Sequence, residues 1–311
     1  IPYYVRFMQE FPTISSLAQA PLDTMLALWS GLGYYSRARN LHRSAHIIMQ
    51  DYQGQFPDTR ELIQRLPGIG RSTAAAITIF AYGRRDAILD GNVKRVLARY
   101  FGIAGYPGES KIQNLLWEKA EESLPANYRE GRIETYTQAL MDLGATVCIR
   151  HTTPLCTTCP LQQHCVAYKE NRVAQFPAVK PRKPLPKKET VFLILMHQQK
   201  LLFEKRPPSG IWGALWCPPE IETGVDAAIY CQHHLGMKVQ SPIELPTIDH
   251  QFTHYKLRIH SQLLKVVSNN HVQQNQFIWI KPSDALEQAI PAPVRKLLKQ
   301  NFLSDDRAIN I

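Results

Sequence analysis

Four of the six cysteines in this chain lie close together, at Cys148, Cys156, Cys159 and Cys165. Their spacing, C-x7-C-x2-C-x5-C, would let four thiolates of one loop close on a single centre. Spacing alone leaves zinc and an iron–sulfur cluster open, because both accept four thiolate ligands. The clustering favours a metal site in a reducing compartment over a framework of disulfides.

A second candidate is LPGIGRSTA, residues 66–74, between two expected helices. Gly68 and Gly70 allow a tight turn and a close approach to another chain, because neither has a Cβ. The helix after the turn, which includes Ser72 and Thr73, would present free backbone amides, a natural site for a phosphate. Alone, the motif indicates a helix–turn–helix corner. In a basic protein we interpret it as a DNA contact.

Two further segments carry polar or aromatic side chains at the start of a helix. In ILDGNVKRVLAR, residues 88–99, Asp90 or Asn92 can act as the N-cap. In GLGYYSRARNL, residues 31–41, Tyr34 follows a Gly-x-Gly turn and precedes several arginines. By themselves these patterns are typical of a capped helix and of ordinary aromatic packing.

The elements that must position these residues change in kind along the chain. Apolar residues at helical spacing predict helices over 22–29, 37–50, 59–65, 71–82, 92–101, 110–124 and 132–145, with Gly83 and Gly102 at helix ends. After residue 190 the pattern predicts a hairpin of 191–196 and 200–206, a strand over 255–260, and helices over 283–289 and 293–302. The fold class is therefore all-α first and mixed α/β afterwards.

The net charge of +10 points to an acidic partner such as nucleic acid. Half of the excess, +5, lies in residues 171–190, where four prolines predict an extended linker between domains. This segment is either a solvated basic tether or a strap along a phosphate backbone. The sequence has no apolar run near the roughly 18 residues that a membrane span needs.

Taken in order, these segments resemble the MutY-type adenine DNA glycosylases of the helix-hairpin-helix/endonuclease III superfamily. The resemblance implies an all-α helix-hairpin-helix glycosylase domain over 1–168 with an iron–sulfur cluster loop at 148–165. A basic Pro-rich linker over 169–190 and an α/β Nudix-like domain over 191–304 would follow. It also implies a bacterial-type, cytoplasmic, nucleoid-associated monomer that has no membrane partner.

The resemblance also assigns chemistry. It implies excision of adenine mispaired with 8-oxoguanine or guanine in double-stranded DNA, with Asp90 stabilising the positive charge that develops on the sugar. Asn92 would join the hairpin in binding DNA. Tyr34 would wedge into the base stack, as base flipping requires. The four cysteines would hold a 4Fe–4S cluster that keeps their loop against DNA.

The segment RPPSGIWGALWCPPE, residues 206–220, extends the resemblance past the linker. Hydrolytic Nudix proteins need a glutamate-rich box for magnesium, and this chain lacks one, so we expect a recognition module. Phe252, Thr253 and His254 match the family's Phe-Ser-His loop for 8-oxoguanine, and threonine keeps the hydroxyl. Without the resemblance, Phe252 would be assigned to the core and His254 to the surface.

Two alternatives remain. An endonuclease III-like pyrimidine glycosylase and lyase carries a nucleophilic lysine directly after the hairpin, where this chain has Ser72, which forms no Schiff base. A non-catalytic mismatch-DNA-binding protein is the other. The family's general acid is a glutamate in an E-V-M-L-Q-Q-T-like helix before the segment that matches Ile1, no such motif occurs here, and Glu10 does not match it.

The first prediction concerns this proton donor, since a positioned acid contributes roughly 10²–10⁴-fold to a rate. We expect the 311-residue chain alone to release adenine from an 8-oxoguanine:adenine duplex very slowly or not at all. An added upstream helix with the glutamate should restore release, and Asp90→Asn should then abolish it again. The measurement is single-turnover adenine release. Adenine release by the chain alone at the rate typical of the family would contradict this account.

Overall fold

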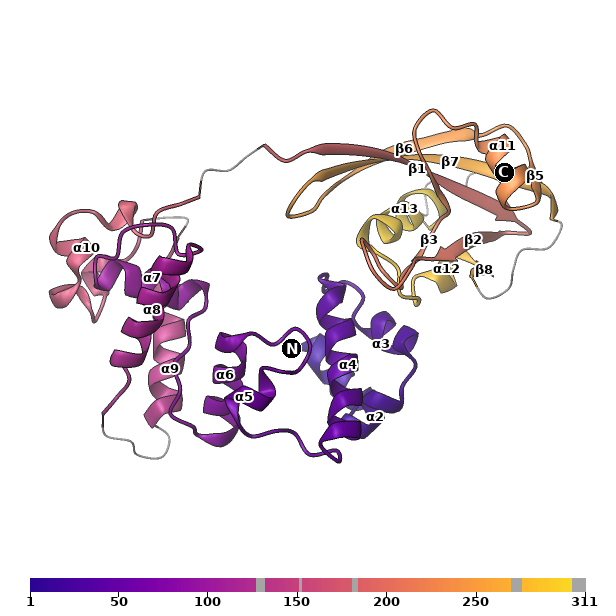
Figure 1. Cartoon of the computed structure of the whole chain (residues 1–311). Coiled ribbons are helices and arrows are strands. Elements are labelled where there is room, and N and C mark those ends of the chain that lie inside the picture. The colour runs from indigo at the N-terminus through magenta and orange to yellow at the C-terminus, as the bar shows by residue number, and fades with distance from the viewer. Residues whose placement is uncertain (127–131, 151–152, 181–183, 270–275, 304–311) are drawn as a thin grey trace. The chain divides into compact units, whose positions relative to one another are not determined.

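The computed structural model describes residues 1–126, 132–150, 153–180, 184–269 and 276–303. The chain forms two compact units (Figure 1). One unit combines Ile1–Gly54 with Lys183–Ile311, and the other is Gln55–Arg182. The sequence assigned residues 1–54 to the glycosylase domain together with the residues that follow. These two units are defined by contacts between residues and not by sequence family. The domain boundaries at 168 and 190 therefore stay a prediction.

The second unit, Gln55–Arg182, is helical. In chain order it contains α5 (Arg60–Ile63), α6 (Arg71–Tyr82), α7 (Gly91–Tyr100), α8 (Ser110–Glu122), α9 (Arg132–Asp142), the π-helical turn η1 (Leu143–Val147), the 3-10 turns η2 (Cys156–Thr158) and η3 (Gln162–His164), α10 (Val166–Lys169) and the 3-10 turn η4 (Val173–Gln175). Its core joins α6 to α9 through residues such as Ile79, Leu97, Leu116 and Ile133.

The helices of this unit begin and end close to where the sequence predicts. Helix α6 has the predicted bounds, and its predicted C-terminal Gly83 has φ 60°. Gly102, just after α7, has φ 65°, a left-handed conformation that glycine adopts without a Cβ clash. The predicted helix 132–145 is interrupted: after Asp142 the chain widens into the π-helical turn η1.

The first unit contains a mixed sheet and the helices that cover it. Its elements are α1 (Pro2–Glu10), α2 (Ile14–Gln19), α3 (Leu22–Leu28), α4 (Tyr35–Asp51), β1 (Lys187–His197), β2 (Lys200–Lys205), β3 (Trp216–Cys217), β4 (Glu220–Ile221), α11 (Ala227–His234), β5 (Met237–Val239), β6 (Ile243–Gln251), β7 (Lys256–Asn269), β8 (Phe277–Ile280), α12 (Pro282–Ala285) and α13 (Ala292–Phe302). The helical patterns above predict neither α1 nor α2.

Within the described residues, the sheet has eight strands, and its main path is β3-β2-β1-β7-β5. Strands β1 and β2 form the predicted antiparallel hairpin, while β1 runs parallel to β7. Strand β4 pairs with β1, β6 with β7, and β8 with β2. The hairpin of β6 and β7 turns at residues 252–255, which places the predicted recognition loop at a strand connection.

The two faces of the sheet are buried by different helices. On β1, Phe192 and Ile194 face a core shared with α13 and with α2 to α4, whereas Leu193 and Leu195 face a second core with α11. This alternation follows the two-residue period of a strand. The first helices of the chain and its carboxy-terminal sheet therefore bury one continuous apolar core.

The described part of the predicted linker is held at both of its ends. In the second unit, the Ala178 N–H donates to the Gly105 carbonyl (3.2 Å), and the Arg99 guanidinium donates to the Phe176 carbonyl (2.9 Å). In the first unit, residues from Lys187 onward pair with β7. Residues 181–183 lie outside the described residues. None of the described helices is long and apolar enough to span a membrane.

Candidate active site and cysteine pocket

Asp90 is the N-cap of α7. Its Oδ1 accepts a hydrogen bond from the Val93 N–H (2.8 Å), and its backbone is extended. The apolar face of α7, which includes Val93 and Leu97, is buried in the core of the second unit. The cap engages only one carboxylate oxygen, and among the described residues the structure gives Oδ2 no partner. The capping role predicted for Asp90 is therefore present, and it orients the carboxylate.

One turn further along α7, the buried Arg95 binds the segment that leads to the first cysteine. Its guanidinium donates to the carbonyls of Gly144 (2.6 Å) and Cys148 (2.6 Å) and to Oδ1 of Asn92 (2.9 Å). Burial lowers the pKa of Arg95, because desolvation disfavours its charge. A hydrogen bond from a charged donor is worth roughly 1.5–3 kcal/mol. Arg95 thus joins the helix that carries Asp90 to the cysteine loop.

Gly144 in η1 lets α7 approach this segment closely. A Cβ on Gly144 would lie 2.6 Å from the Cβ of Asn92 and 3.2 Å from two of its backbone atoms. A backbone atom gives way only if the helix moves, so any larger residue would displace the start of α7. A π-helical turn is rare and is often found at functional sites.

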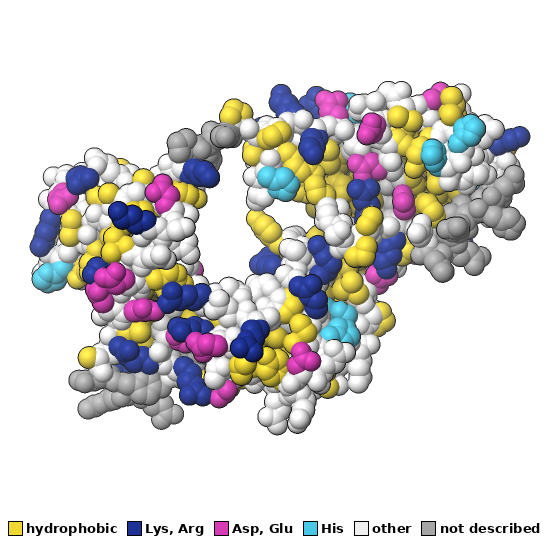
Figure 2. Space-filling view, in the orientation of Figure 1, with side chains coloured by type: hydrophobic (Ala, Val, Ile, Leu, Met, Phe, Trp, Pro, Cys, Tyr) yellow, Lys and Arg dark blue, Asp and Glu magenta, His cyan; other side chains and the backbone are white. Residues whose placement is uncertain are grey.

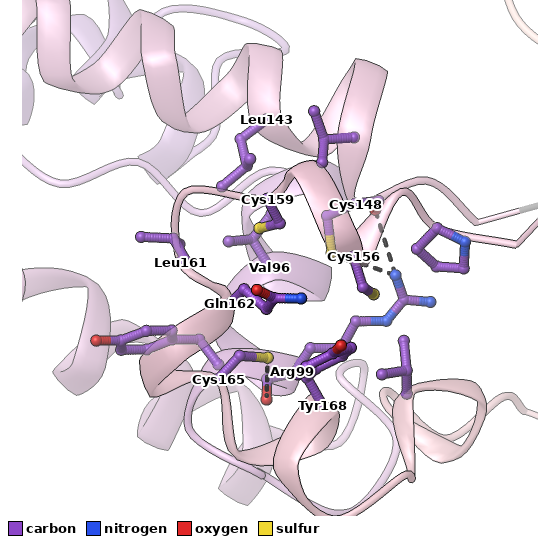
Figure 3. Close-up of a pocket in the computed structure, with 14 residues that line it drawn as sticks. Val96, Arg99, Leu143, Cys148, Cys156, Cys159, Leu161, Gln162, Cys165 and Tyr168 are labelled. Atoms are coloured by element: carbon purple, nitrogen blue, oxygen red, sulfur yellow. Dashed lines mark hydrogen bonds between the residues drawn. The ribbon is translucent and has the colours of Figure 1, made fainter.

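All four cysteines of the array line one pocket (Figure 3). Its other lining residues are mostly apolar, among them Val96 on α7 and Leu143, Leu161 and Val173 around it. Its free volume is about 30 Å³. In the part of the chain that the structure describes, no three His, Cys, Asp or Glu side chains converge on a position for a single metal ion.

Arg99, one turn after Arg95 on α7, supplies positive charge to this pocket. Its guanidinium lies 3.2 Å from Sγ of Cys148 and donates to the Ile149 carbonyl (3.1 Å). Burial raises the pKa of the Cys156 and Cys159 thiols, and neighbouring cysteines add to this. The charge of Arg99 acts on Cys156 in the opposite direction. Because thiolates are the form that binds metals, such a cation favours ligation.

The glycine hairpin connects α5 to α6. Gly68 has φ 77°, and Gly68, Gly70 and Thr73 are exposed. Among the described residues, no side chain caps α6. The Ser72 hydroxyl accepts a hydrogen bond from the Leu89 N–H (2.9 Å), so it holds the segment that ends at Asp90. The spacing of the motif gave no sign of this structural role of Ser72.

Tyr34 is the N-cap of α4, with a left-handed backbone at φ 48° and a ring that is 66% exposed. The Arg37 guanidinium lies 5.1 Å from the centre of the ring. The Trp29 indole N–H donates to the Gly33 carbonyl (3.0 Å) and closes the loop before it. Residues with a side chain that are held in a strained backbone conformation cluster at functional sites. The ring of Tyr34 is therefore not packed in the core, whereas that of Tyr35 packs against it.

The turn between β6 and β7 holds the three predicted recognition residues. Phe252 is half-buried against Trp212, with ring centres 5.5 Å apart, while Thr253 and His254 are exposed. The Thr253 hydroxyl lies 3.4 Å from Nδ1 of His254. The Phe252 N–H donates to the Tyr255 carbonyl (2.9 Å), which closes the turn. A packed phenylalanine thus presents two polar side chains to solvent.

The structure places Asp90, Asn92, the hairpin and the cysteines in the second unit, and Tyr34 and the recognition turn in the first. Sequence reasoning missed Arg95, Arg99 and Gly144. The two arginines lie in the quoted segment 88–99, and their spacing of one helical turn was the available signal. Figure 2 shows that lysine and arginine side chains occur on both units, interspersed with acidic ones.

Family models match both parts of the chain. Residues 1–122 match the HhH-GPD superfamily base excision DNA repair proteins, and residues 190–300 match a NUDIX domain. A solved thermostable thymine-DNA glycosylase is 30% identical, covers 54% of this chain and 76% of its own, and has a TM-score of 0.49. The predicted fold class, a helix-hairpin-helix glycosylase part followed by a Nudix-like α/β part, is confirmed.

Several adenine DNA glycosylases match this chain, some of them over nearly its whole length. That of Buchnera aphidicola subsp. Acyrthosiphon pisum is 37% identical over 304 residues, which cover 97% of this chain and 85% of the relative. That of Homo sapiens is 33% identical over 269 residues, which cover 71% of this chain and 48% of the relative. The chain belongs to the adenine DNA glycosylase family, whose members are DNA N-glycosylases of base excision repair.

The second prediction concerns the contact between η1 and α7. Gly144→Ala should destabilise the protein by about 1–3 kcal/mol, because the new methyl group meets the backbone of Asn92. Gly91→Ala is the matched control: nothing lies within 4 Å of its Cβ, and alanine in the first turn of α7 should be neutral or stabilise by up to about 1 kcal/mol. The free energy of unfolding in urea is the measurement. Equal values for both variants would contradict the close approach.

Proposed function

We propose that this glycosylase removes adenine mispaired with 8-oxoguanine or guanine, with Asp90 as the carboxylate that stabilises the oxocarbenium-like sugar. The observation that carries this assignment is the cap: Val93 binds one oxygen of Asp90 and leaves the other without a partner among the described residues. A fixed carboxylate is already oriented when positive charge develops, so it requires no reorganisation. Asp90 is not the proton donor here, because an ionised carboxylate has no proton to give.

Access of the adenine to Asp90 requires that the base leave the helical stack. We propose that the exposed ring of Tyr34 fills the resulting gap, since a flat aromatic surface replaces base stacking. The hairpin at Gly68 and Gly70 would hold a neighbouring phosphate at the uncapped start of α6, with Thr73 and Asn92 alongside. Lysine and arginine contacts to other phosphates would add affinity without sequence preference.

We propose that Cys148, Cys156, Cys159 and Cys165 hold a 4Fe–4S cluster. The support is that four thiols of one loop line one mostly apolar pocket and that the guanidinium of Arg99 contacts one of them. In such a cluster each thiolate binds its own iron, so the thiols need not meet at one point. The bound cluster would cross-link the loop, while glycosidic hydrolysis itself involves no redox step.

The third prediction tests the metal assignment. Protein purified under anaerobic conditions should contain about four iron atoms per chain and show the visible absorbance of an iron–sulfur cluster. Cys156→Ala should lose both, because one ligand is removed. Cys231→Ala, which changes a buried cysteine outside the pocket, should retain both. A parent protein without iron, or zinc in stoichiometric amount, would refute the cluster.

We propose that the carboxy-terminal part recognises 8-oxoguanine through the turn of Phe252, Thr253 and His254. The support is geometric: Phe252 anchors the turn on Trp212, and the two exposed side chains offer a hydroxyl and an imidazole as hydrogen-bond partners. Such a role fits a module that reads a base rather than one that cleaves a nucleotide.

Two of the acidic residues that follow the segment 206–220, or lie at its end, have structural partners. Glu220 accepts from Arg206 (2.6 Å) and from the Thr190 hydroxyl (2.7 Å). Asp226 caps α11 through the N–H groups of Ala228 and Ile229. These contacts support a recognition module, because the carboxylates already bind protein groups.

The fourth prediction is that the protein binds a duplex with adenine opposite 8-oxoguanine more tightly than one with adenine opposite guanine. A Thr253→Ala, His254→Ala double variant should lose at least about tenfold of this discrimination, since each good hydrogen bond to a base edge is worth roughly 1–3 kcal/mol. Dissociation constants are measured by fluorescence anisotropy in an Asp90→Asn background. Asparagine caps a helix as well as aspartate does, so the background keeps α7.

The control for this experiment is general affinity for DNA. The double variant and its parent should show the same salt dependence, with a log–log slope of about −0.9 for each phosphate neutralised. Recovery of intact duplex after titration shows that no excision took place. If the double variant discriminates as well as its parent, the turn does not read 8-oxoguanine.

A further inference from the structure

The first turns of α4 are hydrogen-bonded to the carboxy-terminal part of the first unit. The Arg39 guanidinium donates to the Gly213 carbonyl (2.8 Å), and the Tyr35 hydroxyl donates to the Ile290 carbonyl (3.2 Å). Burial raises the pKa of Tyr35, so its hydroxyl keeps the proton it donates. Tyr35 directly follows Tyr34, the proposed wedge, and Arg39 lies one turn further along α4. We call Tyr35, Arg39 and Arg295 the α4 clamp.

Arg295, on α13, is the third member of the clamp and contacts the loop that precedes α4. Its guanidinium donates to Oγ of Ser30 (2.9 Å) and to the Leu286 carbonyl (2.7 Å). Ser30 lies in the loop that ends at Tyr34, so the loop is held both before and after the tyrosine. The bonds from Arg39 to Gly213, from Tyr35 to Ile290 and from Arg295 to Ser30 join residues more than 170 positions apart in the sequence, and all of them lie within one compact unit.

The carbonyl that Arg39 binds belongs to a rigid turn. The residues on either side of Gly213, Trp212 and Ala214, have left-handed backbones with φ 55° and 61°. Residues with a side chain rarely adopt this backbone conformation unless surrounding contacts impose it. A Cβ on Gly213 would lie 2.7 Å from the Pro208 carbonyl oxygen, so the turn is packed against its own backbone. This turn is the IWGAL part of the segment 206–220, for which the proposed function supplies no role.

The same turn supports the recognition residues. The Trp212 ring is buried, and it contacts Phe252 (5.5 Å between ring centres), His250 (6.1 Å) and Phe192 (6.0 Å). A continuous series of contacts therefore runs from α4 through Arg39, Gly213 and Trp212 to Phe252. Tyr34 stands at one end of this series, and Thr253 and His254 stand at the other.

We infer that the α4 clamp fixes the spacing between Tyr34 and the turn at residues 252–254, so that both engage one base pair together. Arg39 and Tyr35 are then positioning residues for mispair recognition. This inference rests on the proposed function of Tyr34 and of the turn. Tyr34, Thr253 and His254 are all exposed, so discrimination by the two sites together depends on the distance between them. A few tenths of an ångström separate a good hydrogen bond from a poor one.

The fifth prediction tests the clamp with single variants of the full chain in the Asp90→Asn background. Arg39→Met keeps the aliphatic stem and removes the donor to Gly213. It should lower the discrimination between 8-oxoguanine:adenine and guanine:adenine duplexes at least about fivefold, the equivalent of one hydrogen bond. Arg39→Lys restores a donor and should recover most of the loss. Arg43→Met, one turn further along α4, removes the same charge from an exposed arginine and should leave discrimination unchanged.

A double-mutant cycle measures the coupling between Tyr34 and His254, which would not change if Arg39 had a merely structural role. In the parent, the loss of affinity caused by Tyr34→Ala and His254→Ala together should differ by at least about threefold from the product of the two single losses, because the two side chains act together. In the Arg39→Met background the losses should multiply within about twofold, as they do for independent sites. Tyr35→Phe, which removes only a hydroxyl, serves as the second clamp variant if Arg39→Met folds poorly.

The outcomes separate the inference from the function on which it rests. A parent that does not distinguish 8-oxoguanine from guanine refutes the proposed recognition and, with it, the clamp. A parent that discriminates, with clamp variants that discriminate equally well and keep the same coupling in the cycle, refutes the clamp alone. Loss of discrimination in Arg43→Met as well would show that charge on α4, rather than the contact with Gly213, is responsible.

Discussion

The second unit depends on the buried guanidinium of Arg95. This guanidinium donates to oxygen atoms of Asn92, Gly144 and Cys148, which lie on α7 itself, in η1 and at the start of the cysteine loop. A buried charge is costly unless its hydrogen bonds are satisfied. The folded protein therefore keeps η1 against α7, and this in turn sets where α7 begins and where Asp90 lies. Loss of this contact would loosen the Asp90 carboxylate and the cysteine loop together.

A similar dependence appears in the first unit, with packing in place of charge. The amino-terminal helices share one apolar core with the sheet, through residues such as Met25 and Leu26 on α3 and Phe192 on β1. These side chains are almost fully buried, and each is worth roughly 1.5–3 kcal/mol relative to exposure. An ion pair between Lys205 and Asp23 lies nearby at the surface, where such pairs add little. The core therefore holds α4 beside the carboxy-terminal sheet.

Local features were predictable from the sequence, and distant pairings were not. The bounds of α6 and the β1–β2 hairpin follow from periodicity and turn residues. The spacing of the four cysteines indicated a single site, and all four line one pocket. Periodicity shows that a helix buries one face, but it does not identify the partner. For this reason the packing of α2 to α4 on the sheet was not foreseen. Arg95 escaped notice because its acceptors are mainly backbone carbonyls, which any residue supplies.

Three residues of the first unit that lie near the proposed contacts with DNA, or support them, have a strained backbone. Tyr34, Trp212 and Ala214 have φ values of 48°, 55° and 61°, a conformation that costs roughly 1–2 kcal/mol for a residue with a side chain. Such residues persist only where the surrounding structure imposes the conformation. Trp212 packs on Phe252, and Tyr34 presents its ring to solvent. Packing of Trp212 on Phe252 and the hydrogen bonds of Ser30 and Tyr35 hold the turn at residues 252–255 and the loop before α4, and this makes their spacing a property of the whole unit rather than of either segment.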